Sequence, residues 1–520
     1  MRLVSIAFSL LMAITPSLLF AQNQQIDDQQ TNGVLLPELL RADPNASIFY
    51  SALVATHLID TLGQYLDPNY PEIEYEWTVQ ALRDNYAGIH RDLTSVEDYR
   101  IAYPDKREFK YTLFIVKDAD LAALAIYNLD DLREYAKQIY PEGADLSETE
   151  RESSLNKLIS YHILPFWLPY DQLNISQPEI IRNRKALDEL DVEDFYETLL
   201  PHSIMRISTP YQDDGTPLGI YINRKGTNKS GSVIRGIEIS KKYSSCINGG
   251  YYYVDTPLLY DTHTRQLVLD TRMRIMASTL SPDFINSGAR GRLSGDPVNG
   301  GNANLNRMVF AFKPGFCKNV EWIDGQTQFF VRYRDRYFGT YYGDELSIVG
   351  AFDIVFRLPS VPADGLYELR IWNNSMSSFY TNYRGSILFY TRDEDSDFIP
   401  FGTPVDCSLS LRDSLIGGVP DKEYDHLSDS QREAAINAND KLLHDRGYLK
   451  APDSYAPNNN LRDDIDSYRK IISELYMESD KYYYLRIRQV SLEGVWLPFN
   501  FIEIVPYSVY SGENGQEDKH

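Results

Sequence analysis

One acidic stretch has the carboxylate spacing of a calcium-binding loop. Asp393, Asp395 and Asp397 stand at loop positions one, three and five of an EF-hand. Phe398 follows where such a loop needs its turn glycine, and Pro404 stands where it needs a bidentate glutamate. We therefore interpret the stretch as a solvated turn and expect no metal site.

The sequence has no motif of a common enzyme class. It contains no Gly-x-Ser-x-Gly elbow, no Walker loop, no His-Glu-x-x-His pair and no Gly-x-Gly-x-x-Gly after a strand. Cys246, Cys317 and Cys407 show no zinc spacing, and whether two of them pair stays open. A carboxylate pair for glycoside hydrolysis also stays open among 74 acidic residues, since the fold sets the distance between two carboxylates. We expect no enzyme activity and no cofactor.

The chain does concentrate residue types that bind sugars. A flat aromatic ring packs against the C–H face of a sugar, while amide, carboxylate or guanidinium groups bind its hydroxyls. Residues 333–344 mix rings, arginines and acids, and residues 372–374 and 379–384 add Trp, Asn and Tyr. The alternative, that these rings are core or strand-edge packing, stays open. The candidate ligand residues are Trp372, Arg370, Asn373, Tyr337, Tyr341 and Tyr342.

A predicted strand at residues 367–372 must position the tryptophan. Successive side chains of a strand point to opposite faces. Tyr367 and every second residue after it are apolar and form one face, while Glu368, Arg370 and Trp372 share the other. We expect the second face to be solvated and Trp372 to be exposed there.

The second half as a whole has the pattern of a β-sandwich with helical insertions. Short strands separated by turns are typical of such a fold. Further strands are predicted at residues 328–333, 352–358, 385–391, 483–490 and 500–505. One helix is predicted with a capping box at Ser430 and Glu433 and a stop at Gly447. A second short helix is predicted at residues 467–477.

The first half alternates helix and strand patterns. Asp118 stands between a strand and a helical stretch, where a helix N-cap belongs. Asn248-Gly249 predicts a type I′ hairpin turn, which needs positive φ at both central residues. Helices are predicted at residues 48–66, 152–161 and 194–200, and strands at 111–116, 204–208, 233–240 and 251–254.

Three segments, in order, resemble the motifs of fasciclin (FAS1) domains, and together they cover roughly residues 37–262. The matching residues are Thr112, Phe114 and Asp118 of the first motif, Tyr161 and His162 of the tyrosine-histidine motif, and Asn248, Gly249 and Asp255 of the second motif. Three positions depart from the family pattern: Ile115-Val116 stand in place of Ala-Pro, and Tyr252 stands in place of a histidine.

The resemblance implies an α+β wedge, with a twisted sheet and a helical layer, and a role in adhesion or in matrix or glycan binding. In animal members the tyrosine-histidine region has been tied to receptor binding. For Tyr161 and His162 we favour a structural role, with a hydrogen-bonded core histidine at a helix end. The second half resembles galactose-binding-type jelly rolls that accompany FAS1 domains in exported proteins of gut Bacteroidetes, at residues 365–371, 384–387, 402–406 and 501–506.

The first residues have the order of a secretory signal peptide. Arg2 precedes an uncharged apolar run at residues 3–20, and Ala21 gives a small-residue cleavage site before a polar stretch. The mature chain would carry 50 basic and 74 acidic residues, because the signal removes one of the 51 basic ones, so its net charge is 50 − 74 = −24. Such a surface disfavours nucleic acid and anionic membranes as partners.

The sequence therefore predicts an exported α+β protein that is periplasmic, on the cell surface or extracellular. Its expected parts are a signal peptide at 1–21, a FAS1-like domain at 37–265, a galactose-binding-like sandwich at 266–510 and a polar tail at 511–520. The main hypothesis is a non-catalytic adhesion or glycan-binding protein whose partner is a glycan or a cell-surface or matrix protein. The alternatives are an accessory subunit of an outer-membrane nutrient-uptake assembly and a carbohydrate-active hydrolase. Ligand, oligomeric state and the assignment of residues 266–280 stay open.

Overall fold

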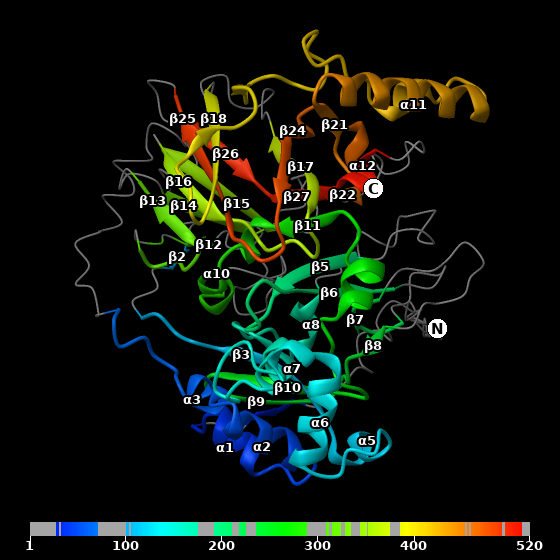
Figure 1. Cartoon of the computed structure of the whole chain (residues 1–520). Helices are drawn as coiled ribbons and strands as arrows, with labels where there is room; N and C mark the ends of the chain where they lie inside the picture. The colour runs from blue at the N-terminus through cyan, green and yellow to red at the C-terminus, as the bar shows by residue number, and fades with distance from the viewer. Residues whose placement is uncertain are drawn as a thin grey trace, which may run out of the picture.

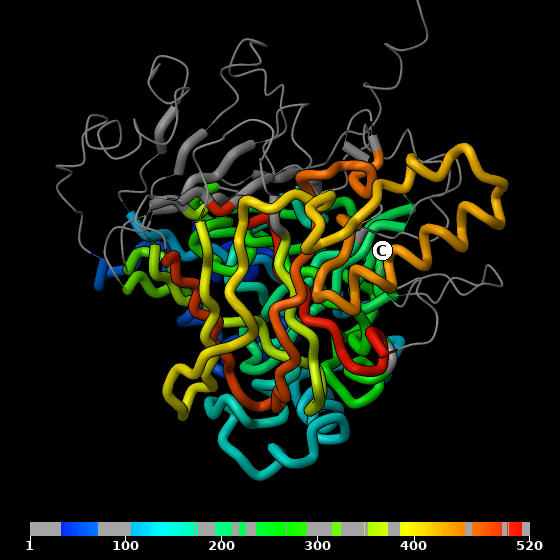
Figure 2. Tube along the Cα trace, turned by 90° about the horizontal axis from the view of Figure 1, so that it is seen from above, coloured from blue at the N-terminus to red at the C-terminus, as the bar shows by residue number. Residues whose placement is uncertain are grey.

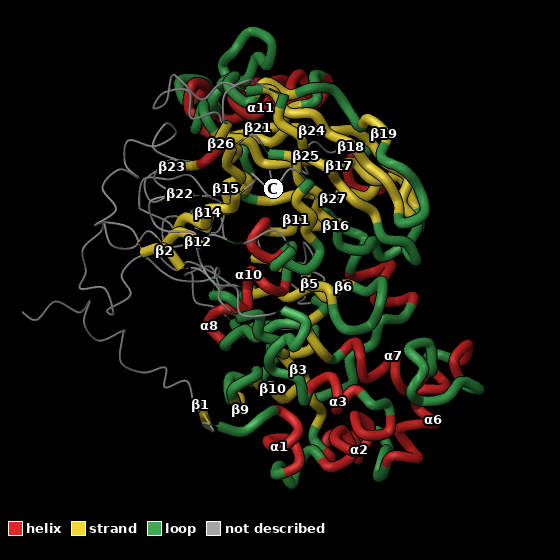
Figure 3. The backbone as a smooth tube through the Cα atoms, turned by 90° about the vertical axis from the view of Figure 1, so that its left-hand side faces the viewer, coloured by secondary structure: helices red, strands yellow, loops and turns green. Residues whose placement is uncertain are grey.

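The computed structural model shows an α+β protein with a helix-rich part built from the first half and a sheet-rich part built from the second (Figures 1 and 3). The structure describes residues 28–30, 33–70, 100–102, 106–174, 192–210, 218–224, 236–288, 308–310, 312, 315–323, 328–333, 344–350, 352–374, 385–452, 455–456, 459–490 and 495–511. The predicted signal peptide lies outside these residues. Within these ranges, no helix combines the length and the apolar character that a bilayer crossing requires.

A five-stranded sheet forms the centre of the helix-rich part. Its order is β1 (Asp28–Gln30), β9 (Tyr243–Cys246), β10 (Gly249–Val254), β3 (Tyr111–Val116) and β4 (Ile163–Leu164). Every residue of β3 is buried, as expected for a β-branched and aromatic run at the centre of a sheet. The helices of this part are α1 (Leu36–Arg41), α2 (Ser47–Ala55), α3 (Leu58–Leu62), α5 (Asp118–Ala122), α6 (Leu129–Ile139), α7 (Ser154–Tyr161) and α8 (Tyr170–Leu173).

The predicted helix at residues 48–66 is divided into α2 and α3. His57 lies between them with a φ of 58°, a left-handed conformation that a continuous right-handed helix excludes. The predicted helix at 194–200 is wrong, because β5 (Val192–Glu197) pairs there with β6 (Ile204–Thr209). The order of this four-stranded sheet continues with β7 (Tyr221–Ile222) and β8 (Ile237–Glu238). Of the strand predicted at 233–240, the described residues contain only β8.

The sheet-rich part holds two larger sheets. The first has the order β11 (Met273–Met276), β27 (Phe501–Pro506), β17 (Gly365–Asn374), β24 (Ser467–Met477) and β21 (Tyr448–Lys450). The second has the order β13 (Val320–Trp322), β16 (Asp353–Arg357), β25 (Tyr483–Gln489), β18 (Ser386–Asp393) and β19 (Ile399–Pro400), with β20 (Val405–Asp406) on β18. Side chains of both sheets meet in one apolar core, for example Leu369 and Ile502 with Phe356 and Ile487.

Smaller elements complete this part. A three-stranded sheet joins β14 (Gln328–Tyr333), β15 (Asp344–Gly350) and β26 (Val495–Phe499), and two-stranded sheets join β12 (Met308–Phe310) to β2 (Arg100–Ala102) and β22 (Tyr455–Ala456) to β23 (Asn459–Asn460). The helices are α10 (Pro282–Asn286), α11 (Asp429–Asp445) and α12 (Tyr507–Tyr510). Figure 2 shows α11 in orange, projecting to one side of the strands. All three cysteines are free.

Two predictions about the helical insertions need correction. Residues 467–477 form strand β24 and not a helix, because β17 and β21 on its two sides satisfy its backbone groups. Helix α11 begins two residues earlier than predicted, since its N-cap is Ser428, whose N–H donates to Gln431 Oε1 at 3.4 Å. Its predicted end is confirmed: Gly447 follows the helix with a φ of 78°.

The two halves of the chain share their cores. Phe195 and Ile204 of the first half belong to the core of the sheet-rich part, and Ile285 of the second half belongs to the core of the helix-rich part. Arg107 donates from Nε and Nη2 to the two carboxylate oxygens of Asp283, at 3.1 and 3.0 Å. The domain boundary near residue 265 stays a prediction, and these contacts cross it.

Candidate functional site

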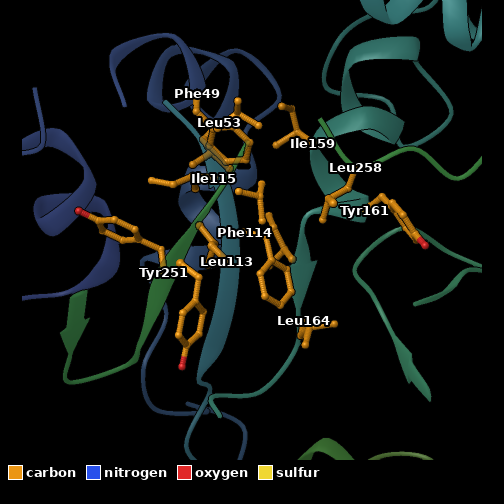
Figure 4. Close-up of a cluster of buried hydrophobic side chains, with 14 of the residues drawn as sticks. Phe49, Leu53, Leu113, Phe114, Ile115, Ile159, Tyr161, Leu164, Tyr251 and Leu258 are labelled. Atoms are coloured by element: carbon orange, nitrogen blue, oxygen red, sulfur yellow. The ribbon is translucent and has the colours of Figure 1, made fainter. Parts of the chain in front are cut away.

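The three segments that resemble FAS1 motifs meet in one sheet. Strand β3, which carries the first motif, lies between β10 of the second motif and β4, which follows the tyrosine-histidine motif. The β3–β10 pair is parallel, and Thr112 is opposite Gly250. Figure 4 shows Phe114 of β3 among apolar side chains that come from α2, α7 and β4. Segments more than a hundred residues apart therefore build one core.

His162 ties these segments together at the end of α7. Its Nδ1 lies 2.6 Å from the carbonyl oxygen of Phe114, and its Nε2 accepts the N–H of Leu258 at 2.9 Å. Since a carbonyl oxygen only accepts, Nδ1 carries the proton and the ring is neutral. Burial lowers the pKa of His162 to about 4, although the bond to Phe114 opposes this shift. The histidine is 1% exposed, so it cannot touch a ligand, which matches the structural role that we favoured.

The other polar residues of the first two motifs are also bonded internally. Thr112 Oγ1 donates to the carbonyl of Phe166 at 2.7 Å and accepts the N–H of Leu168 at 3.1 Å. The Tyr161 hydroxyl donates to the carbonyl of Ile204 at 3.1 Å. Tyr252, which replaces the family histidine, stacks on Phe114 at 6.0 Å between ring centroids and donates to the carbonyl of Leu168.

Asp118 caps a helix, but not the one that follows it. The side chain makes no cap on α5, which begins at Asp118 itself. Its carboxylate instead accepts the N–H groups of Ser47 and Ile48, at 3.1 and 3.0 Å, and the hydroxyl of Ser47 at 2.6 Å. These are the free donors in the first turn of α2. The prediction that Asp118 caps a helix was right, but the capped helix is α2 and not α5.

The second motif does not form the predicted turn. Cys246 pairs with Gly249, so the two turn residues are Ile247 and Asn248, and neither has positive φ. Gly249 has a φ of 133° and begins β10. The buried Asn248 side chain accepts the N–H of Leu36 at 2.9 Å and donates to the carbonyl of Leu62 at 2.7 Å. Asn248 therefore joins the hairpin to the helical layer. Asp255 is exposed.

The predicted ligand platform on β17 is wrong. Trp372 is 1% exposed and Arg370 is fully buried. The alternation of β17 is as predicted, because Tyr367, Leu369 and Ile371 belong to the core between the sheets and Trp372 does not. The other face, however, is also buried: Trp372 packs edge to face on Phe501, with ring centroids 5.2 Å apart. The side chain of Asn373 and all of Tyr337, Tyr341 and Tyr342 lie outside the described residues.

Ion pairs between arginines and glutamates allow this second face to be buried. Glu503 Oε1 lies 2.7 Å from Arg274 and 3.3 Å from Arg469, and Arg370 Nη1 lies 3.5 Å from Glu503 Oε2. Arg370 Nε also donates to Glu368 at 2.5 Å. Burial alone would raise the pKa of Glu503, but the arginines outweigh it, Arg469 first, and lower the pKa to about 2. A sequence pattern cannot show such a layer, because Glu and Arg are typical of solvated faces.

The acidic stretch at residues 393–397 forms a turn, as interpreted. Asp395 N–H donates to Asp393 Oδ1 at 3.1 Å, and Asp393 N–H donates to Ser396 Oγ at 3.1 Å. Among the residues that the structure describes, no group of three or more metal-ligating side chains comes together.

Three tyrosines that the sequence analysis missed lie at the outer end of the sheet. Tyr476 is 59% exposed and Tyr507 is 56% exposed, and Tyr510 lies beside Tyr507 on α12. The alternation of Glu474 and Tyr476 with apolar neighbours was a usable signal. The predicted helix at residues 467–477 concealed this signal, because residues two apart share a face in a strand but not in a helix.

No family model matches this chain, and a search of the curated proteins finds no significant match.

Proposed function

We propose that this chain is an exported adhesion or glycan-binding protein without catalytic activity. The observation that carries the proposal is the meeting of the three FAS1-like segments around His162, which bonds Phe114 on one side and Leu258 on the other. These segments resemble the family motifs in their sequence order, and in space they meet in one sheet. A FAS1-like domain built on them supports a role in adhesion or in matrix or glycan binding.

The proposed ligand surface differs from the motif residues. Thr112, Tyr161 and His162 are buried, and their side chains form hydrogen bonds inside the protein. Binding must therefore use residues on the outer surface of the protein. In this proposal the ligand-contacting residues do not include Tyr161 and His162, unlike in a protein whose tyrosine-histidine pair contacts a receptor.

Glycan-array binding by the purified mature chain tests the proposal, together with binding to immobilised matrix proteins. Selective binding to one glycan class or one matrix protein is the expected result. Release of reducing sugar from a polysaccharide panel would instead favour a hydrolase, and binding to neither kind of ligand would overturn the proposal. Mass determination of the exported chain tests cleavage after Ala21.

A second candidate, an accessory subunit of an outer-membrane nutrient-uptake assembly, is favoured by the surface around α11. Leu415 is 70% exposed and Leu442 on α11, which lies beside Gly417, is 39% exposed. Exposed apolar side chains that form a contiguous patch mark protein contacts. Pull-down from native membranes distinguishes this candidate, since it requires co-purification with membrane uptake proteins in the absence of glycan.

A further inference from the structure

Three tyrosines and one glutamate gather where the charged face of the sheet reaches solvent. We name Tyr476, Tyr507, Tyr510 and Glu474 the α12 tyrosine cluster. The rings of Tyr507 and Tyr510 lie edge to face with centroids 5.3 Å apart. The Tyr510 hydroxyl donates to Glu474 Oε1 at 2.6 Å, and the Ser508 hydroxyl donates to Asp270 at 2.7 Å. These two bonds hold α12 against the sheet.

Strand register places the remaining ring. Glu474 and Tyr476 are two residues apart on β24, so they project from the same face. On one side of β17, Leu366 is opposite Tyr476 of β24. On the other side, the next residue of β17, Tyr367, is opposite Pro506 of β27, which directly precedes α12. Tyr507 therefore begins on the far side of β17 from Tyr476, about 10 Å away across two strand spacings.

The cluster has the exposure that Trp372 lacks. Tyr476 and Tyr507 are 59% and 56% exposed, while Glu368 and Arg370, further along the same face, are almost fully buried. Leu366 between the two tyrosines is half-buried. One face of the sheet thus changes from a buried charged layer to an exposed aromatic surface. Figure 1 shows α12 beside β27 and β17 at this end of the sheet.

We propose that the α12 tyrosine cluster binds an uncharged glycan. The inference rests on the proposed glycan-binding function and names its site and ligand class. Tyrosine faces offer apolar area to sugar C–H groups at low entropic cost. Glu474 can accept hydrogen bonds from sugar hydroxyls through the oxygen that Tyr510 does not use.

The surrounding charges select the ligand class. Three exposed carboxylates lie around the cluster: Glu474 within it, Asp270, which accepts a hydrogen bond from Ser508 of α12, and Asp364, which stands two residues before Leu366. Carboxylates at the rim repel uronate and sulfate groups. An uncharged polysaccharide suffers no such repulsion, so it is the ligand that fits.

The test measures the affinity of the mature full-length chain for uncharged polysaccharides (galactomannan, dextran and laminarin) and for anionic ones (polygalacturonate and chondroitin sulfate). We expect binding to at least one uncharged polysaccharide. Tyr476→Ala and Tyr507→Ala should each weaken it at least tenfold, which is about 1.4 kcal/mol. Tyr507→Phe keeps the ring and should bind within a few-fold of the parent chain.

Tyr127→Ala is the matched control, because Tyr127 is 69% exposed and lies in the helix-rich part. It should leave affinity unchanged, and all variants should keep the parent melting temperature. Parent-like binding by Tyr476→Ala and Tyr507→Ala would overturn the cluster while leaving glycan binding intact. A preference for the anionic polysaccharides would overturn the ligand class. If the parent chain bound no glycan, the proposed glycan-binding function would fail, and this inference with it.

Discussion

Single side chains in the helix-rich part act by satisfying backbone groups of distant segments. His162 bonds β3 and the chain that follows β10, and Asp118 bonds the first turn of α2. Asn248 reaches both α1 and the end of α3. Each of these residues is polar, yet its role is to close the core, so substitutions should change stability before they change binding.

His162 should make the stability of the protein depend on pH. Its folded-state pKa of about 4 lies below the ordinary value of 6.5, so the unfolded chain takes up a proton first as the pH falls. The free energy of unfolding should therefore decrease between about pH 6.5 and 4, by up to roughly 3 kcal/mol from this group. His162→Gln should be less stable at pH 7 and should lose less stability over this interval. Denaturant unfolding at several pH values measures both, and identical pH slopes would contradict the assignment.

Asp118→Ala should lower the free energy of unfolding by about 0.5–2 kcal/mol, because α2 loses the acceptor for two N–H groups. Asp118→Asn keeps one carbonyl oxygen and should recover part of the loss. Chemical denaturation measures the effect, and amide hydrogen exchange locates it. Faster exchange at Ser47 and Ile48 is expected, whereas faster exchange confined to α5 would show that the cap belongs to the other helix.

At the level of elements, two close contacts fix the architecture. The first is the approach of β10 to β3, where Gly249 lies against the backbone of Tyr111. The second is a buried group of four charges that joins α11 to its sheet. Asp421 and Asp440 accept hydrogen bonds from Arg462 at 2.5 and 2.6 Å, and Lys450 donates to Asp421 at 2.6 Å.

Gly249→Ala should destabilise the helix-rich part by at least about 2 kcal/mol. A Cβ at this position would lie 2.0 Å from the carbonyl oxygen of Tyr111, and the φ of 133° is unfavourable for any side chain. Gly315→Ala is the control, since Gly315 also has positive φ but has no atom within 4 Å of the added Cβ. The control should cost less. Equal melting temperatures of the two variants would exclude a steric role for Gly249.

Asp440→Ala should cost about 3–5 kcal/mol, because it leaves Lys450 and Arg462 with one carboxylate between them in a buried place. Asp445→Ala, which breaks the exposed pair with Lys441, should cost less than about 1 kcal/mol. Thermal unfolding compares the two variants. A small effect of Asp440→Ala would mean that water reaches the group and replaces the lost carboxylate.

At the level of the whole molecule, the two halves form a continuous structure. Residues of the first half pack in the core of the sheet-rich part, and β2 of the first half pairs with β12 of the second. Arg357 of β16 also donates to Glu197 of β5 at 2.5 Å. Contacts of this kind couple the unfolding of one part to that of the other.

The full chain should therefore unfold in one calorimetric transition, and residues 33–265 expressed alone should be much less stable. The fragment would expose Phe195 and Ile204, which are 3% and 0% exposed in the full chain, and would lose the Arg107–Asp283 pair. Two well-separated transitions in the full chain, or a fragment that melts at the same temperature as the full chain, would show independent domains.

The sequence by itself determined the α+β class, the strand β3 and the two faces of β17, and it favoured a structural role for His162. These features follow from local periodicity and from motif order, which residues within a short window carry. Much of the candidate site was not accessible in this way. The alternation on β17 correctly placed Trp372 on the face opposite the core between the sheets. The prediction that this face is exposed to solvent was wrong.

Only the tertiary structure decided which helix Asp118 caps, that residues 467–477 form a strand, and that Trp372 is buried while Tyr476 and Tyr507 are exposed. The physical reason is the same in each case. Periodicity shows which side chains share a face, but the partner of that face comes from a distant part of the chain. Arg274, Arg469 and Glu503 lie far apart in sequence, and only their meeting in one sheet makes burial of the charged face favourable.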